Sequence, residues 1–197
     1  MKWYEKYLSV YGKPYADVSA EVMDGIRNRL RTLQSDEPLV SVVVIAYNEE
    51  KHLPACLWSL SESVCEYPME IIGVNNDSAD RTADVFEASG IPYHTELQHS
   101  CGYARRCGLQ YAQGKYYICI DSDTMYPPGY VQAMTDALQR PGIVAVSSLW
   151  SYMPDEGHPW LGLKIYEFMR DTHLWMQSFK RPELSVRGLV FAYNADY

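Results

Sequence analysis

The chain has 197 residues, of which 47% are hydrophobic and 21% are charged, so it can bury a core of ordinary size and is too apolar to be disordered. Sequence-independent binding of DNA or RNA requires a basic face, which a net charge of -8 argues against, so we expect no nucleic-acid partner. None of the five cysteines stands in a C-x-x-C pair, which argues against a zinc site and favours reduced thiols.

An N-terminal helical extension, residues 1–37, is predicted to precede the main domain. Its start is rich in tyrosine, and from Asp17, the expected N-cap, apolar residues recur at helical spacing up to Leu33. We predict a helix that packs on the main domain; a docking or membrane-surface helix is the alternative. The polar stretch 35–38 indicates a linker to the second predicted unit, residues 38–197.

Strands and helices are predicted to alternate from residue 39 onward. The run 40–46 is rich in β-branched residues with little polar alternation, which is typical of a strand buried on both faces. Asn48 is expected to cap the first helix, Gly90 to end the second and Gly114 to end the third. Further strands are predicted at 70–74, 91–94, 116–120 and 143–146. The order predicts an α/β fold, with a mostly parallel sheet between helical layers.

Three polar clusters follow strands of this sheet, at 47–49, 75–80 and 121–123. Because the carboxyl ends of parallel strands meet at one edge, and ligands bind there, we expect a shared site. No glycine-rich phosphate loop follows the first strand, so a bound diphosphate would need another holder.

The triplet from Asp121 to Asp123 is the candidate for that holder. Two carboxylates at i and i+2 on a strand end can bind a hard metal ion, and the small Ser122 leaves room for it. Two helix-capping aspartates are the structural alternative. A calcium loop is disfavoured, because Met125 and the prolines break its pattern.

Four segments, at 42–50, 74–82, 102–109 and 116–128, together resemble the family 2 glycosyltransferases of the GT-A fold. The resemblance covers residues 39–150. It implies a GT-A-like three-layer sandwich with a mostly parallel central sheet.

The resemblance also implies roles for single residues. Tyr47 would stack on or flank the base, and Arg105 would approach the diphosphate. Asn76 stands where many members have an aspartate that accepts from the base, and because its amide also donates, the identity of the base stays open. Asp123 would be the main metal ligand, with Asp121 on the ribose or, through water, on the metal. The implied sets are Ala46, Tyr47, Glu49, Asn76, Asp77, Arg105, Asp121 and Ser122 for the nucleotide sugar, and Asp121 and Asp123 for the metal.

Structural alternatives exist for several of these residues. Tyr47 could simply pack in its loop, Asp77 and Asp80 could be helix caps, and Arg105 could pair with a neighbouring carboxylate.

The implied reaction is transfer of a sugar, with inversion, from a nucleoside diphosphate sugar to a hydroxyl group. UDP-sugar is the favoured donor, the acceptor a carbohydrate or a lipid-linked molecule, and the cofactor Mn²⁺ or Mg²⁺. The expected location is the cytoplasm, with peripheral attachment at the inner face of the membrane as the alternative.

The sequence lacks the motif that carries the general base in the family it resembles. Family members carry it in a Glu-Asp pair, and no such pair follows Asp123. The segment 185–194 resembles the strand before that pair, so we expect a truncated chain whose base lies beyond Tyr197; Asp155 and Glu156 are the alternative. An aromatic-rich helix is predicted at 160–179, either packed on the sheet or forming an acceptor-side wall.

Two other functions stay open. The absent Glu-Asp pair favours a non-catalytic nucleotide-sugar-binding module. A nucleotidyltransferase is disfavoured, because those enzymes start with a glycine-rich loop carrying Arg and Lys after the first strand.

Overall fold

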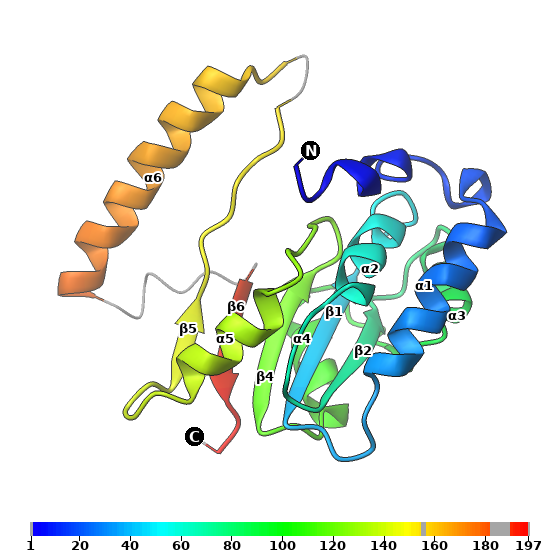
Figure 1. Cartoon of the computed structure of the whole chain (residues 1–197), viewed down its shortest axis with the longest axis horizontal. Coiled ribbons are helices and arrows are strands. Elements are labelled where there is room, and N and C mark those ends of the chain that lie inside the picture. The colour runs from blue at the N-terminus through cyan, green and yellow to red at the C-terminus, as the bar shows by residue number, and fades with distance from the viewer. Residues whose placement is uncertain (1, 155–156, 182–189, 197) are drawn as a thin grey trace.

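The structure, a computed structural model, describes residues 2–154, 157–181 and 190–196. Within this part of the chain, one six-stranded sheet has the order β3-β2-β1-β4-β6-β5 (Figure 1). β1 pairs in parallel with both β2 and β4, and β2 pairs in parallel with β3. The strands are β1 (Val40–Ala46), β2 (Met69–Asn75), β3 (Tyr93–Thr95), β4 (Tyr116–Asp121), β5 (Ala145–Ser147) and β6 (Val190–Asn194).

The predicted α/β fold with a mostly parallel sheet is confirmed, with one difference at its edge. β6 pairs antiparallel with β4 and lies between β4 and β5. β5 pairs antiparallel with β6 rather than joining the parallel series directly. The last strand of the chain thus fills the position next to β4, a long-range pairing that local sequence pattern does not encode.

Helices cover both faces of the sheet, because side chains of β1 point alternately to either side. Val42 and Val44 share a core with α1, α2, α3 and α5, whereas Val43 and Ile45 pack with Ala104 of α4. The helices are α1 (Ala20–Leu33), α2 (Leu53–Ser61), α3 (Thr82–Ser89), α4 (Cys101–Tyr111), α5 (Tyr130–Leu138) and α6 (Trp160–Lys180), preceded by the 3₁₀ turns η1 (Glu5–Ser9) and η2 (Tyr15–Asp17).

Two of the predicted helix starts are wrong. α1 is capped by Ser19, whose side chain accepts from the backbone N–H of Val22, while Asp17 lies in η2. Asn48 does not cap α2, which begins at Leu53. Asn48 adopts a left-handed backbone (φ 55°) and uses its side chain to accept from the backbone N–H of Ala79. Tertiary hydrogen bonds therefore override local capping preference at this loop.

Of the two glycines predicted to end helices, Gly90 does so and Gly114 does not. Gly90 ends α3 in the left-handed conformation (φ 73°), as expected. Gly114 is not the C-cap of α4, which is Ala112. A Cβ at Gly114 would lie 2.7 Å from the backbone nitrogen of Ser41, so glycine is needed here for close backbone approach.

The N-terminal segment packs on the domain, as predicted. Met23, Ile26 and Leu30 of α1 are buried in the main core. Ahead of α1, Tyr7 is 1% exposed and donates a hydrogen bond of 2.9 Å from its hydroxyl to Glu62. Residues from the beginning of the chain are thereby fixed to the end of α2.

Glu62 is the polar centre of this contact. Its carboxylate also accepts from the indole N–H of Trp58 (3.2 Å) and pairs with Lys6. Burial alone would raise the pKa of Glu62, but the hydrogen bonds from Lys6 and Tyr7 outweigh burial, so the pKa lies below the ordinary value of 4.5. The ionised form therefore stabilises the folded chain.

We expect Glu62→Gln to lower the free energy of unfolding by about 1 kcal/mol at pH 7. Because the folded-state pKa is below 4.5, the wild-type advantage is complete above that pH and disappears as the pH falls through the folded-state pKa. Urea unfolding of both proteins from pH 7 to pH 3 measures the difference. Glu37→Gln, at an exposed linker position, should show no such difference. A gap between wild type and Glu62→Gln that widened in acid would contradict the assignment.

α6 stands beside the sheet domain, joined to β5 by an extended segment (Figure 1). Its Glu167 accepts from the backbone N–H of Tyr152 (2.8 Å), and its Arg170 donates to the carbonyl of Trp150 (2.6 Å). It thus packs on segment 150–152, not on the sheet. Many of its other large apolar side chains are exposed, including Leu161, Ile165, Phe168, Trp175 and Phe179.

No helix in the described ranges is both long and apolar enough to cross a bilayer.

Candidate functional site

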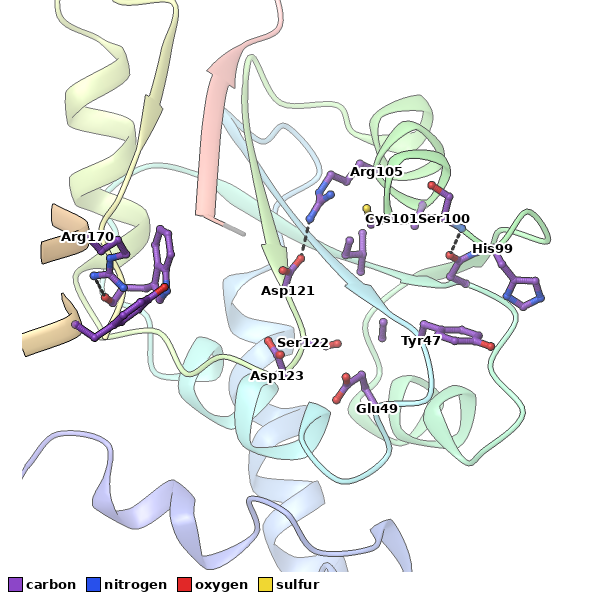
Figure 2. A pocket seen from close by; sticks show the side chains of 16 residues that line it. Tyr47, Glu49, His99, Ser100, Cys101, Arg105, Asp121, Ser122, Asp123 and Arg170 are labelled. Carbon is purple, nitrogen blue, oxygen red and sulfur yellow. Dashed lines mark hydrogen bonds and ion pairs between the residues drawn. The ribbon is translucent and has the colours of Figure 1, made fainter. Parts of the chain in front are cut away.

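A cleft of about 830 Å³ opens at the carboxyl ends of β1, β2 and β4, where the polar clusters were predicted to meet (Figure 2). Its floor comes from the strand ends and one wall from the start of α4. The opposite wall comes from segment 150–152 and α6. The lining residues are Ile45, Ala46, Tyr47, Glu49, Asn76, His99, Ser100, Cys101, Ala104, Arg105, Asp121, Ser122, Asp123, Trp150, Tyr166 and Arg170.

All but one of the predicted site residues line this cleft. The exception is Asp77, which has a left-handed backbone (φ 54°) and carries its carboxylate 3.3 Å from Nε2 of His99. Tyr47 is 52% exposed, with its ring edge-on to that of His99. Its aromatic face is therefore available for stacking at the mouth of the cleft.

An ion pair between Asp121 and Arg105 lies inside the cleft. Nη2 of Arg105 donates to Oδ1 of Asp121 over 2.9 Å, and both side chains are about four-fifths buried (Figure 2). Burial raises the pKa of Asp121 to about 6; Arg105 opposes this rise and the carboxylate of Asp123 adds to it. Nε of Arg105 is buried without a hydrogen-bond partner among the described residues. One N–H donor of this guanidinium is therefore unpaired behind the cleft surface.

Asp123 is the more available of the two carboxylates. It is exposed, and its side chain accepts only a 3.1 Å bond from the neighbouring Thr124 among the hydrogen bonds of the described residues. Across those same ranges, no three or more His, Cys, Asp and Glu side chains converge to form a metal cage. The carboxylates of Asp121 and Asp123 fit Mn²⁺ or Mg²⁺. Such ions are held by one or two carboxylates and take their remaining ligands from phosphates and water.

The loops after β1 and β2 are joined to each other by hydrogen bonds. Asp80 accepts from the backbone N–H groups of Glu50 (3.1 Å) and of Thr82, the first residue of α3 (2.9 Å), whereas the N-cap position of α3 is Arg81. The backbone N–H of Glu49 donates to the hydroxyl of Thr82 (2.8 Å). Part of the second polar cluster therefore holds the loop after β1 in place.

Glu49 projects from that loop into the cleft. Its carboxylate lies 2.7 Å from Nδ1 of His52. Burial raises the pKa of Glu49, the hydrogen bond from His52 opposes the rise, and the charges of Asp123 and Asp80 add to it. Glu49 therefore belongs to the same patch of negative charge as Asp123, which a divalent cation would neutralise.

Asn76 has a structural role that the sequence did not reveal. Its Nδ2 donates to the carbonyl groups of Glu96 and Gln98, both over 2.8 Å, and its Oδ1 accepts from the N–H of Ser100 over 3.0 Å. The residue is 5% exposed. The amide thereby fixes the loop that leads into α4, and Oδ1 retains one lone pair for a ligand.

We expect Asn76→Asp to destabilise the protein by roughly 3 kcal/mol, although aspartate is the residue that many family members carry. A carboxylate cannot donate, so it would face two carbonyl oxygens in a buried position. Chemical denaturation of the variant and of Asn28→Asp, on the exposed face of α1, compares a buried with an exposed replacement. Equal stability of the two variants would refute the anchoring role.

Several lining residues were missed in the sequence. Ser100 is the N-cap of α4, and together with Cys101 it brings that helix N-terminus to the cleft. A serine ahead of a helix, in a loop at the carboxyl edge of the sheet, is a signal that could have indicated this. Trp150, which lines the cleft, was also missed. Arg170, on the helix predicted at 160–179, lies across the cleft from Tyr47 (Figure 2).

Arg170 is held tightly on that far wall. Its guanidinium lies 4.2 Å from the ring centre of Trp150 and pairs with Asp171 at 2.8 Å. The helix predicted at 160–179 therefore forms part of the cleft wall through Tyr166 and Arg170, and it packs on segment 150–152. The alternative base, Asp155 and Glu156, lies outside the described residues.

Two glycosyltransferases illustrate the sequence relatives of this chain. Validoxylamine A glucosyltransferase of Streptomyces hygroscopicus subsp. limoneus is 26% identical over 167 residues, which cover 77% of this chain and 37% of that protein. Dolichol-phosphate mannosyltransferase of Pyrococcus furiosus is 24% identical over 114 residues, covering 55% of this chain and 32% of that protein. The chain spans about a third of the length of these relatives.

Solved structures of glycosyltransferases share the fold. Glucosyl-3-phosphoglycerate synthase from Mycobacterium tuberculosis, in complex with Mn²⁺, UDP and glucosyl-3-phosphoglycerate, superposes with a TM-score of 0.58 at 21% identity, covering 94% of this chain and 63% of that one. Mannosyltransferase PcManGT from Pyrobaculum calidifontis, with GDP-Man and Mn²⁺, gives 0.59 at 16% identity, covering 99% and 57%. These likenesses confirm the GT-A-like fold.

The sequence profile of one family spans most of the chain. It matches residues 41–193, from the second residue of β1 to the penultimate residue of β6, under the description Glycosyl transferase family 2. The chain therefore belongs to glycosyl transferase family 2.

Proposed function

We propose that this chain forms the donor-binding part of a metal-dependent glycosyltransferase that moves a sugar from a nucleoside diphosphate sugar to a hydroxyl acceptor with inversion. The observation that carries the proposal is the meeting, in one cleft, of an exposed carboxylate, a buried Arg105–Asp121 pair and the N-terminus of α4. Relatives with similar folds were solved with UDP or GDP-mannose and Mn²⁺, which supports this class of donor.

The diphosphate is assigned to the middle of the cleft. Arg105 lines the cleft and carries the positive charge that attracts phosphate oxygens, and the N–H groups at the start of α4 favour an anion. Asp123 would hold the metal, with Asp121 oriented by Arg105 toward the metal's water or the ribose. When bound, the metal would stabilise the charge that develops on the leaving diphosphate. The buried Ser122 leaves this space open.

The base of the nucleotide is assigned to the end of the cleft at Tyr47. The exposed ring of Tyr47 offers a stacking surface, and the remaining lone pair of Oδ1 of Asn76 can accept from a base N–H. UDP is the favoured nucleotide. Ala46, Glu49 and Asp77 complete the set of residues assigned to the donor.

The acceptor is assigned to the opposite wall. Trp150, Tyr166 and Arg170 face the cleft there. Aromatic rings beside a guanidinium suit a carbohydrate, whose hydroxyl groups accept hydrogen bonds while its apolar ring faces pack on the aromatic side chains. A carbohydrate or lipid-linked acceptor fits this wall.

Calorimetric titration of UDP, GDP and CDP into the folded chain, with Mn²⁺ or with a chelator, tests the proposal. We expect one of the three, with UDP favoured, to bind in the presence of Mn²⁺ and to bind far more weakly with the chelator. If a demonstrably folded chain binds none of the nucleotides under either condition, the assignment of the cleft as a donor site is wrong.

A further inference from the structure

The N-terminal segment contacts the cleft-lining residue Asp123 from outside the part of the chain that matches the family, which begins at residue 41. The hydroxyl of Tyr11 donates to the carbonyl oxygen of Asp123 over 3.2 Å. The ring of Tyr11 lies on that of His52, with centres 4.8 Å apart. His52 in turn holds Glu49 through the 2.7 Å contact described above. One side chain thus contacts the loop after β4 and, through His52, the loop after β1.

The segment that carries Tyr11 is fixed by contacts that do not involve its hydroxyl. Tyr7 and Val10 are buried against Ala55 of α2, and the ring of Tyr7 packs edge-on to Trp58. The backbone N–H of Gly12 donates to the carbonyl of Lys51 over 2.9 Å. Removing the hydroxyl of Tyr11 therefore leaves the segment in place and deletes a single contact to the loop after β4.

The side chain of Asp123 faces the cleft from the short loop after β4. The position of its backbone therefore sets where the carboxylate lies in the cleft. Behind this loop, Tyr126 is held from both sides: its N–H donates to the hydroxyl of Ser59 (3.0 Å) and its own hydroxyl donates to the carbonyl of Asp121 (3.1 Å). These bonds fix the two ends of the stretch from Asp121 to Tyr126. The bond from Tyr11 fixes its middle, at the residue whose carboxylate is most exposed.

We propose that Tyr11 is a positioning residue of the donor site, which holds Asp123 and the Glu49–His52 pair at the spacing that suits a divalent cation and a diphosphate. The proposal rests on the function proposed above. The N-terminal segment is then a working part of the site rather than only a packing element. Loss of one neutral hydrogen bond corresponds to about a fivefold change in affinity.

The test compares Tyr11→Phe with Tyr4→Phe, which removes a hydroxyl from the same segment but no hydrogen bond to the loop after β4. Amide hydrogen exchange of residues 122–126 is measured in the metal-free protein, and nucleotide affinity is measured by calorimetry with Mn²⁺ and with chelator. For Tyr11→Phe we expect faster exchange in this loop, an affinity about fivefold weaker with Mn²⁺, and an unchanged affinity with chelator. Tyr4→Phe should match the wild type in every measurement.

The outcomes separate this inference from the function on which it rests. Unchanged loop exchange in Tyr11→Phe, or faster exchange with unchanged affinity in Mn²⁺, overturns the positioning role while wild-type binding still supports the donor site. A fivefold loss that is the same with chelator also overturns it, because the effect would then not pass through the metal ligand. Absence of all nucleotide binding by the wild type rejects the proposed function itself.

Discussion

Asp123→Asn is expected to weaken nucleotide binding in the presence of Mn²⁺ by at least about 100-fold, which is roughly 3 kcal/mol. The substitution keeps the size of the side chain but removes its negative charge. Because Asp121 already forms an ion pair with Arg105, the exposed Asp123 is the carboxylate that is free to bind a cation. The remaining amide oxygen is a far weaker ligand for a hard metal ion.

Titration of the nucleotide that binds the wild type, with Mn²⁺ and with chelator, measures the effect. In chelator, the variant should bind at least as well as the wild type, since a carboxylate that would repel the diphosphate has gone. Asp36→Asn, at an exposed position in the linker, serves as the control for loss of one negative charge. Retention of full Mn²⁺-dependent affinity by Asp123→Asn would show that the metal is held elsewhere.

Gly108→Ala is expected to lower the free energy of unfolding by about 3 kcal/mol. Gly108 is buried in α4 where the helix crosses the sheet, and a Cβ there would lie 2.3 Å from Cγ1 of Val43 and 3.0 Å from the hydroxyl of Tyr117. Both neighbours are buried, at 0% and 1% exposure, so neither can move aside cheaply.

Gly102→Ala is the matched control in the same helix. A Cβ at Gly102 meets only the hydroxyl oxygen of Ser100, at 3.6 Å, so the change should be neutral or slightly stabilising, since alanine favours helix. Denaturant unfolding of both variants gives the midpoint and slope. Equal midpoints for Gly108→Ala and Gly102→Ala would mean that α4 can shift away from the sheet without cost.

The packing at Gly108 also concerns the site. The hydroxyl of Tyr117 donates to the backbone carbonyl of Arg105 over 2.8 Å, so the side chain that Gly108 accommodates also holds the turn of α4 that carries Arg105. Displacement of α4 would therefore separate Arg105 from Asp121. We expect the residual folded Gly108→Ala protein to bind nucleotide more weakly than Gly102→Ala does.

The local pattern of the sequence was enough to place the parallel strands and to predict that the polar residues after them meet. The uniform β-branched run 40–46 predicts a strand buried on both faces, and all of its residues are buried. Strand ends in a parallel sheet share one edge, so the polar residues that follow them were expected to meet, and Asp121, Asp123 and Asn76 do line one cleft. These features depend on side-chain periodicity and on chain direction, both of which are encoded locally.

Helix caps could not be predicted reliably from local signals. Asn48 is a favoured capping residue, but its side chain binds the loop after β2, 31 residues further on. Asn76 was interpreted as a base-recognition residue, yet most of its amide is engaged with backbone at positions 96 to 100. Polar side chains at strand ends have several partners within reach, and only the folded loops decide among them.

What the sequence by itself determined is the α/β architecture and the edge of the sheet where the polar strand-end residues meet, because each follows from a pattern within a few residues. Only the tertiary structure decided that β6 lies beside β4, that Arg170 and Trp150 line the same cleft as the strand-end residues, and that Tyr11 reaches Asp123 across 112 residues of sequence. Such contacts join segments that are distant in sequence, and they form because burial and hydrogen bonding of the whole chain offset the entropy of bringing those segments together.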